Sequence, residues 1–142
     1  MTTKKAIVQH VKGVTFIGKA DTNHWIVMDG PEEFGGSNAG TRPKELLLIA
    51  LGGCTASDVA SILKKKRVNL KNFYLNIDAE VSPEPPQVYT KINIEYVVEG
   101  KNIEPKDVER AIELSSTKYC AVSHMLKNSV NITHAYKIIE IE

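Results

Sequence analysis

The chain has 142 residues, which is the usual length of a single domain. Hydrophobic residues make up 42% and charged residues 25%, a composition that excludes collagen-like, low-complexity and disordered chains. The 18 Lys and Arg residues nearly balance the 17 Asp and Glu residues, so the formal charge of +1 gives no sign of a nucleic-acid-binding or membrane-surface protein. We therefore expect one soluble domain, residues 1–142.

From the sequence, we expect neither secretion nor membrane insertion. No window approaches the roughly 18 apolar residues of a membrane span, and residues 1–12 mix Lys, Thr and Gln. Two cysteines, Cys54 and Cys120, are too few for a secreted disulfide framework, and their spacing fits neither a zinc finger nor a CxxC redox pair. These features predict a cytoplasmic protein without membrane or nucleic-acid partners.

Three short antiparallel strands, a mobile loop and a long helix are predicted in the N-terminal half. The strands are rich in β-branched and aromatic residues, the loop is rich in Gly, Ser and Asn, and a proline suits the first turn of the helix. The helix is apolar nearly all round, which predicts burial on all sides. The ranges, in order, are 6–13, 14–19, 24–28, 32–40 and 43–67.

The C-terminal half predicts a long hairpin, a second helix, a further helical piece that Thr117 caps, and a last strand. The Ser and Thr residues before this piece predict a bend, because their hydroxyl groups compete with the helix hydrogen bonds. The resulting order is βββ-α-ββ-α-β, an α+β fold with a mainly antiparallel sheet. The ranges are 72–81, 88–98, 102–114, 118–127 and 131–141.

Cys54 lies within the first predicted helix, directly after Gly52 and Gly53. Each glycine lowers helix stability by roughly 1 kcal/mol relative to alanine, so the pair needs a compensating reason. Without side chains, the backbone beside the thiol is open to another helix or to a substrate. The alternative is a free cysteine that packs as a small hydrophobic residue.

Asp58 follows Cys54 by four residues, and His124 follows Cys120 by four, so each pair shares one helix face. If the two helices cross near the cysteines, these four groups converge. They would suit a dithiol redox centre or a metal held by two thiolates, an imidazole and a carboxylate; alternatively, His124 is an exposed helix residue. A cap at Thr117 would place Cys120 in a first helical turn, which predicts a lowered pKa for its thiol.

The segments around the two cysteines, residues 42–59 and 118–126, resemble the OsmC/Ohr family of osmotically inducible and organic hydroperoxide resistance proteins. The likeness extends over essentially the whole chain. Residues 28–30, 118–120 and 131–134 look closest to the YhfA-like branch of that family.

This resemblance implies an intertwined homodimer in which two central helices are wrapped by antiparallel sheets, with sites at the subunit interface. In peroxidase members, the first cysteine attacks an organic hydroperoxide and becomes a sulfenic acid. The second cysteine captures it as a disulfide, which a small dithiol, often lipoyl-linked, reduces. By resemblance, these catalytic roles fall to Cys54 and Cys120, and the disulfide protects the sulfenic acid from irreversible over-oxidation.

The chain departs from the family at the groups that hold the attacking thiolate, a Glu directly after the helix-opening proline and an Arg in the preceding segment. Here Lys44 follows the proline and Glu45 comes one place later, which turns its side chain by about 100°. Residues 31–41 contain no Arg, and Arg42 is the nearest. Lys44, Arg42 and Glu45 are therefore candidates for thiolate stabilisation, and the candidates for lining the site are Asp58, His124, Gly53 and Tyr119.

The preferred interpretation is a thiol-dependent organic hydroperoxide reductase that needs no cofactor or metal. One alternative is a non-catalytic OsmC-like dimer that binds a small apolar or thiol-reactive ligand at its interface. The other is a metal site built from the Cys, Asp and His pairs.

Overall fold

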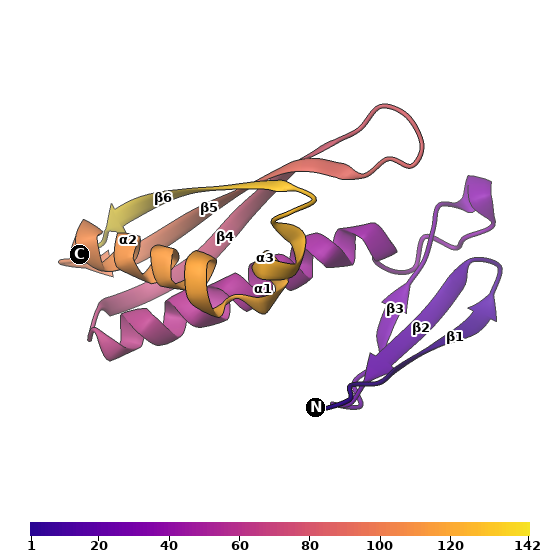
Figure 1. The fold of residues 1–142 in the computed structure, drawn as a ribbon, viewed down its shortest axis with the longest axis horizontal. Helices are drawn as coiled ribbons and strands as arrows, with labels where there is room; N and C mark the ends of the chain where they lie inside the picture. Colours follow the sequence, from indigo (N-terminus) through magenta and orange to yellow (C-terminus); the bar gives the residue numbers. More distant parts are fainter. The chain divides into compact units, whose positions relative to one another are not determined.

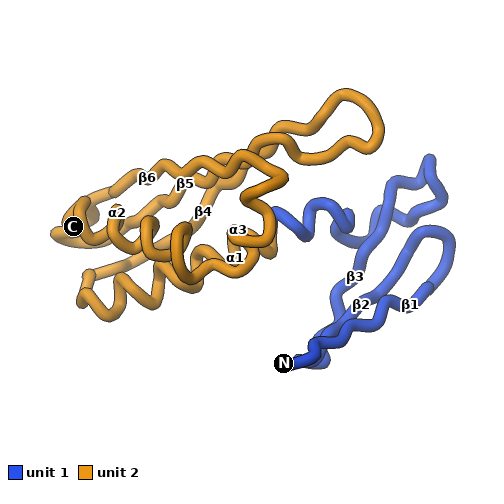
Figure 2. The backbone as a smooth tube through the Cα atoms, viewed as in Figure 1, with its two compact units in different colours: residues 1–48 blue, residues 49–142 orange.

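The computed structural model describes residues 1–142 and consists of two compact units, residues 1–48 and 49–142 (Figure 2). Its element order confirms the α+β class and the predicted order, and α3 lies within the further helical piece predicted at residues 118–127 (Figure 1). The single domain stays a prediction. The elements are β1 (Ala6–Lys12), β2 (Thr15–Ala20), β3 (Ile26–Met28), the 3-10 turn η1 (Glu32–Phe34), α1 (Pro43–Lys65), β4 (Asn69–Val81), β5 (Tyr89–Lys101), α2 (Pro105–Leu114), the π-helical turn η2 (Ser115–Tyr119), α3 (Ala121–Leu126) and β6 (Asn131–Glu140).

Unit 1 contains an antiparallel sheet in the order β1-β2-β3. The segment expected as a mobile loop is folded around the carboxylate of Asp29, which accepts hydrogen bonds from the backbone N–H groups of Gly30 at 2.8 Å, Ser37 at 3.1 Å and Ala39 at 3.1 Å. Burial tends to raise the pKa of Asp29, but these hydrogen bonds favour the ionised form and hold it below its ordinary value.

Unit 2 contains a sheet in the order β4-β5-β6. Strands β4 and β5 pair antiparallel, as the hairpin prediction requires, whereas β5 and β6 pair parallel with Ile94 opposite His134. The prediction of antiparallel sheets is therefore wrong for β6. The chain leaves the end of β5, returns through α2, η2 and α3, and begins β6 beside the start of β5, and such a crossover gives parallel strands.

The hydrophobic core lies in unit 2. Its helices pack on one side of the sheet in Figure 1, and alternate residues of β5 are buried, as expected for a strand with one face on a core. The buried hydrophobic residues are Leu51, Val59, Leu63, Ile92, Ile94, Tyr96, Val97, Val98, Ile103, Val108, Ala111, Ile112 and Cys120.

Helix α1 is buried along one stripe only, whereas the sequence predicted burial on all sides. Leu51, Thr55, Val59 and Leu63 recur every four residues and are at most 1% exposed, but Ile49 is 59% exposed. Contrary to the sequence expectation, α1 is long and apolar enough to cross a membrane by length and composition. The core helix of a soluble protein meets the same criterion.

Candidate dithiol site

Helix α1 supplies the first half of the site, and the two glycines before Cys54 have different surroundings. A Cβ atom on Gly52 would lie 2.6 Å from Cδ1 of Ile77, so the missing side chain lets β4 approach the helix. A Cβ atom on Gly53 would meet nothing within 4 Å, and this residue is exposed. Gly52 therefore serves helix–sheet packing, whereas Gly53 leaves open space beside the thiol.

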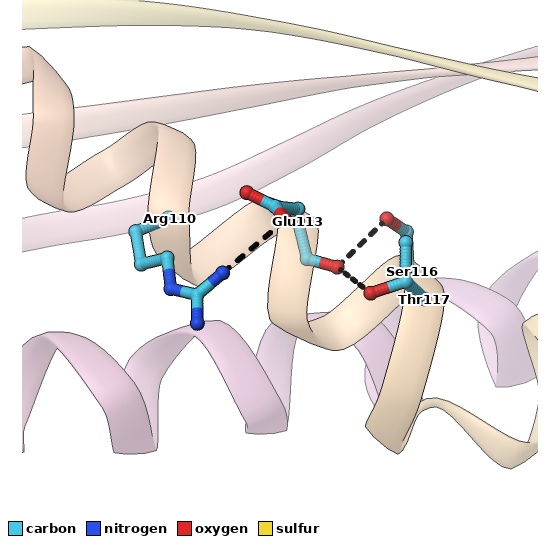
Figure 3. A network of polar contacts seen from close by, with 4 residues as sticks. All are labelled: Arg110, Glu113, Ser116 and Thr117. Atoms are coloured by element: carbon cyan, nitrogen blue, oxygen red, sulfur yellow. Dashed lines mark hydrogen bonds and ion pairs between the residues drawn. The ribbon is translucent and has the colours of Figure 1, made fainter.

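The turn η2 supplies the second half of the site. The hydroxyl groups of Ser116 and Thr117 donate to the backbone carbonyl of Glu113 at 3.2 and 2.7 Å (Figure 3). The carboxylate of Glu113 pairs with the guanidinium of Arg110 at 3.2 Å. These hydroxyl bonds accompany a π-helical turn, after which the helix restarts at Ala121, so the predicted interruption of the helix is confirmed.

Cys120, and not Thr117, is the N-cap of α3. Its Sγ atom accepts a hydrogen bond from the backbone N–H of Ser123 at 3.4 Å. The predicted Thr117 cap is wrong because the Thr117 hydroxyl is bonded to Glu113 and the helix begins only at Ala121. The wider turn thus moves the thiol itself to the start of the helix.

Three of the four predicted groups meet in unit 2. The Sγ atoms of Cys54 and Cys120 and a carboxylate oxygen of Asp58 all lie within 4.8 Å of one another. Cys54 is half-buried and Cys120 is fully buried; both are free thiols. The fourth residue, His124, has its Nε2 atom 3.0 Å from the carbonyl oxygen of Thr117 and does not belong to this cluster.

Burial raises the pKa of the Cys120 thiol above its ordinary value, so the predicted lowering is wrong. Thr55, whose Oγ1 atom lies 3.4 Å from Sγ, and the N–H of Ser123 favour the thiolate, but the neighbouring Cys54 thiol opposes it. Burial outweighs the start of a six-residue helix. At neutral pH, a thiol with a raised pKa is less often ionised and is therefore a weaker nucleophile.

Asp58 links the thiols to a groove of about 420 Å³. The buried hydroxyl of Ser115 donates to its Oδ2 atom at 2.9 Å and fixes the carboxylate. The groove also contains Tyr119, a predicted lining residue that is 52% exposed. The full lining is Asp58, Ser61, Ile62, Lys65, Lys66, Leu114 and Tyr119.

The three candidates for thiolate stabilisation belong to unit 1. Glu45 accepts a hydrogen bond from the backbone N–H of Arg42 at 2.8 Å, which satisfies a free donor at the start of α1. The Arg42 guanidinium donates to the side-chain oxygen of Asn38 at 2.8 Å. A role for these residues and for Lys44 at the thiolate stays a prediction.

Sequence reasoning missed the polar residues behind the cysteines. Thr55 and Ser115 contact the cluster directly. Only their positions in the sequence, beside Cys54 and in the predicted bend, could have pointed to them.

A second buried polar pair lies in the core of unit 2. Tyr96 is fully buried, and its hydroxyl is hydrogen-bonded to Nδ1 of His134 at 2.8 Å. Burial, with a smaller contribution from the charge of Cys120, raises the pKa of Tyr96, and burial lowers the pKa of His134.

Comparison with known proteins identifies the family. The family model described as OsmC-like protein matches residues 35–135, so the chain belongs to the OsmC-like family and the resemblance is confirmed. The protein named YhfA of Escherichia coli strain K12 is 39% identical over 138 residues, which are 95% of this chain and 98% of that protein.

Solved structures agree with this assignment. A hypothetical protein from Aquifex aeolicus VF5 has a TM-score of 0.87 and 32% sequence identity, and the match covers 100% of both chains. The organic hydroperoxide resistance protein OhrB of Bacillus subtilis has a TM-score of 0.61 and 14% identity over 96% of this chain and 98% of that one. At this low identity, the second likeness concerns the fold alone.

Proposed function

We propose that the protein reduces organic hydroperoxides through a two-cysteine cycle, with Cys54 as the attacking thiol and Cys120 as the resolving thiol. The carrying observation is that the two sulfur atoms lie within 4.8 Å of each other while only Cys54 is accessible. Membership of a family that includes organic hydroperoxide resistance proteins supports the same chemistry.

In the first step, the Cys54 thiolate attacks one oxygen of the hydroperoxide. An S–O bond forms, the O–O bond breaks, and the remaining alkoxide takes up a proton and leaves as an alcohol. The Cys120 sulfur then attacks the Cys54 sulfenic acid, forming an S–S bond and releasing the hydroxyl group and the thiol proton as water. A small dithiol, such as a lipoyl-type reductant, restores both thiols by disulfide exchange.

Kinetic measurements on the two cysteine variants test these roles. With cumene hydroperoxide and dihydrolipoamide, wild-type protein is expected to turn over, and Cys54→Ser is expected to lose all activity. Cys120→Ser should consume about one equivalent of peroxide per chain and accumulate a sulfenic acid, because no thiol resolves it. Reduced wild-type protein that consumes no peroxide would overturn the proposal and favour the non-catalytic ligand-binding dimer.

We also propose that the protein acts as a homodimer in the cytoplasm. The cytoplasm is the compartment in which thiols are kept reduced. The support is the sheet of unit 1. Val8 and Ile26 both pair with Gly18 and share one face, while Ile7 and Val27 lie on the other, so the sheet is apolar on both sides. Apolar side chains that are 42 to 61% exposed are Ile7, Val8, Val11, Trp25, Ile26 and Val27.

Light scattering during size-exclusion chromatography tests the dimer. Wild-type protein should elute with twice the chain mass, and Val8→Asp should shift the population toward monomer because it places a charge in the apolar sheet face. Ser129→Asp, which adds the same charge at an exposed polar position, should leave the dimer unchanged. Monomeric wild-type protein would contradict the proposal.

A further inference from the structure

The cluster in unit 2 contains one group that the peroxide cycle leaves unused, the carboxylate of Asp58. With the two thiols, it brings three metal-ligand types within 4.8 Å of one another. In a tetrahedral zinc site with Zn–S bonds of about 2.3 Å, two sulfur ligands are about 3.8 Å apart. Each pair of ligand atoms therefore needs to move closer by at most about 1 Å to reach bonding geometry, which is within the reach of side-chain rotation.

The outer contacts of these groups are those of a supported metal site. The Ser115 hydroxyl holds Oδ2 of Asp58, and the carboxylate has a second oxygen to offer. Thr55 and the backbone N–H of Ser123 contact Sγ of Cys120. Such outer-shell bonds orient ligands and strengthen metal binding.

The cluster also has an entry path and room for a fourth ligand. Cys54 is half-buried, and Asp58 lines the groove of about 420 Å³. Two thiolates and a carboxylate would give a bound divalent cation a net charge of −1, with water in the fourth position. His124 is outside the cluster, so this ligand set differs from the one expected from the sequence.

We propose that the reduced protein binds one Zn²⁺ ion per chain through Cys54, Asp58 and Cys120, and that formation of the Cys54–Cys120 disulfide releases it. Binding displaces the two thiol protons. On oxidation, the two sulfur atoms lose two electrons to the oxidant and form the S–S bond, while zinc leaves as Zn²⁺. Zinc binding does not depend on the proposed peroxidase activity; only the identity of the physiological oxidant, a hydroperoxide, rests on it.

Competition with a chromophoric zinc chelator tests the site in the reduced, tag-free full chain. The expected stoichiometry is one Zn²⁺ per chain. Asp58→Asn should weaken binding at least tenfold because it removes a charged ligand, whereas Asp78→Asn, at an exposed position on β4, should leave the affinity unchanged. Equal affinity in the two variants, or no zinc binding by the wild type, would overturn the three-ligand site.

Two further measurements define the ligands and the release. Cobalt substituted for zinc should give a thiolate-to-cobalt charge-transfer band in wild-type protein that disappears in Cys54→Ser and in Cys120→Ser. Protein oxidised with diamide, which forms disulfides without peroxide, should bind no zinc; retained zinc would overturn the release. Zinc binding without peroxide turnover would refute the proposed function alone, and turnover without zinc binding would refute this site alone.

Discussion

The two units of the chain are stabilised by different kinds of interaction. Every buried hydrophobic residue belongs to unit 2, where the helices cover its sheet. In unit 1, the buried side chains are the polar ones of Thr15 and Asp29, and the strands expose apolar residues on both faces. Unit 2 therefore has a core of its own, whereas unit 1 depends on backbone pairing and on the hydrogen bonds of one carboxylate.

This difference indicates which unit depends on dimer formation for its stability. A small sheet in water gains stability chiefly from the apolar face that it buries, and a three-stranded sheet with two exposed apolar faces gains little. The proposed homodimer would provide the missing burial for unit 1. Unit 2 already buries its core within one chain, so its stability should depend much less on the partner.

The largest expected effect is a truncation in the core of unit 2. Leu63→Ala should lower the free energy of unfolding by about 2–5 kcal/mol, because it removes a side chain that is 0% exposed and leaves a cavity. The control is Ile7→Ala in unit 1, which is 52% exposed. In urea denaturation of dilute, monomeric protein, Ile7→Ala should lower the free energy of unfolding by less than about 0.5 kcal/mol. The loss should be larger at concentrations at which the dimer forms.

If Ile7→Ala lowered the free energy of unfolding of dilute protein as much as Leu63→Ala does, the proposed difference between the two units would be wrong. Such a result would mean that the apolar residues of unit 1 are already buried within one chain.

The second prediction concerns the carboxylate that organises unit 1. Asp29→Asn should lower the free energy of unfolding by about 1–3 kcal/mol. The reason is that an amide NH₂ group would then face backbone N–H donors that the carboxylate satisfied. Hydrogen exchange of the Ser37 and Ala39 amides should accelerate. Asp21→Asn, at an exposed position, should leave these amides protected.

The pH dependence of the same variant has a defined sign. The pKa of Asp29 is lower in the folded state, so its contribution is fully present above its ordinary pKa near 4 and is lost as the pH falls through the lowered folded value. Asp29→Asn should lack this part of the acid dependence. Unchanged amide protection in the variant would show that the loop does not need the charge.

Sequence patterns predicted the elements well because each pattern is local. Alternation identified the strands of the hairpin, and the opening proline located the first residue of α1 at Pro43. The parallel pairing of β5 with β6 was not predicted, because partner choice between strands distant in the sequence leaves no mark on the alternation of either one. The burial of α1 was overestimated, because an all-round apolar sequence does not show which of its faces another element covers.

The candidate site was predicted in part for a similar reason. The four-residue spacing correctly grouped Asp58 with Cys54. The corresponding inference for His124 failed because η2 delays the start of α3, so that Cys120 becomes the cap. The raised pKa of Cys120 depends on tertiary burial, which no local motif around the cysteine encodes.

The smallest expected effect concerns His134, on the edge of the unit 2 core. Burial lowers its pKa, so below the ordinary histidine pKa of about 6.5 the unfolded state binds more protons than the folded state, and stability falls as the pH drops. His134→Asn retains a hydrogen-bonding partner for the Tyr96 hydroxyl but does not titrate. Its free energy of unfolding should therefore decline less between pH 7 and pH 5 than that of wild type.

The control for this measurement is His24→Asn, the same substitution at an exposed position of unit 1. Parallel pH profiles for wild type and His134→Asn would contradict the prediction. If only His134→Asn flattens the profile, acid destabilises the protein below the ordinary histidine pKa through the core of unit 2, and at still lower pH through the Asp29 hydrogen bonds of unit 1. The two units would then differ in their response to pH for the same reason that they differ in packing: one buries an uncharged ring and the other a charged carboxylate.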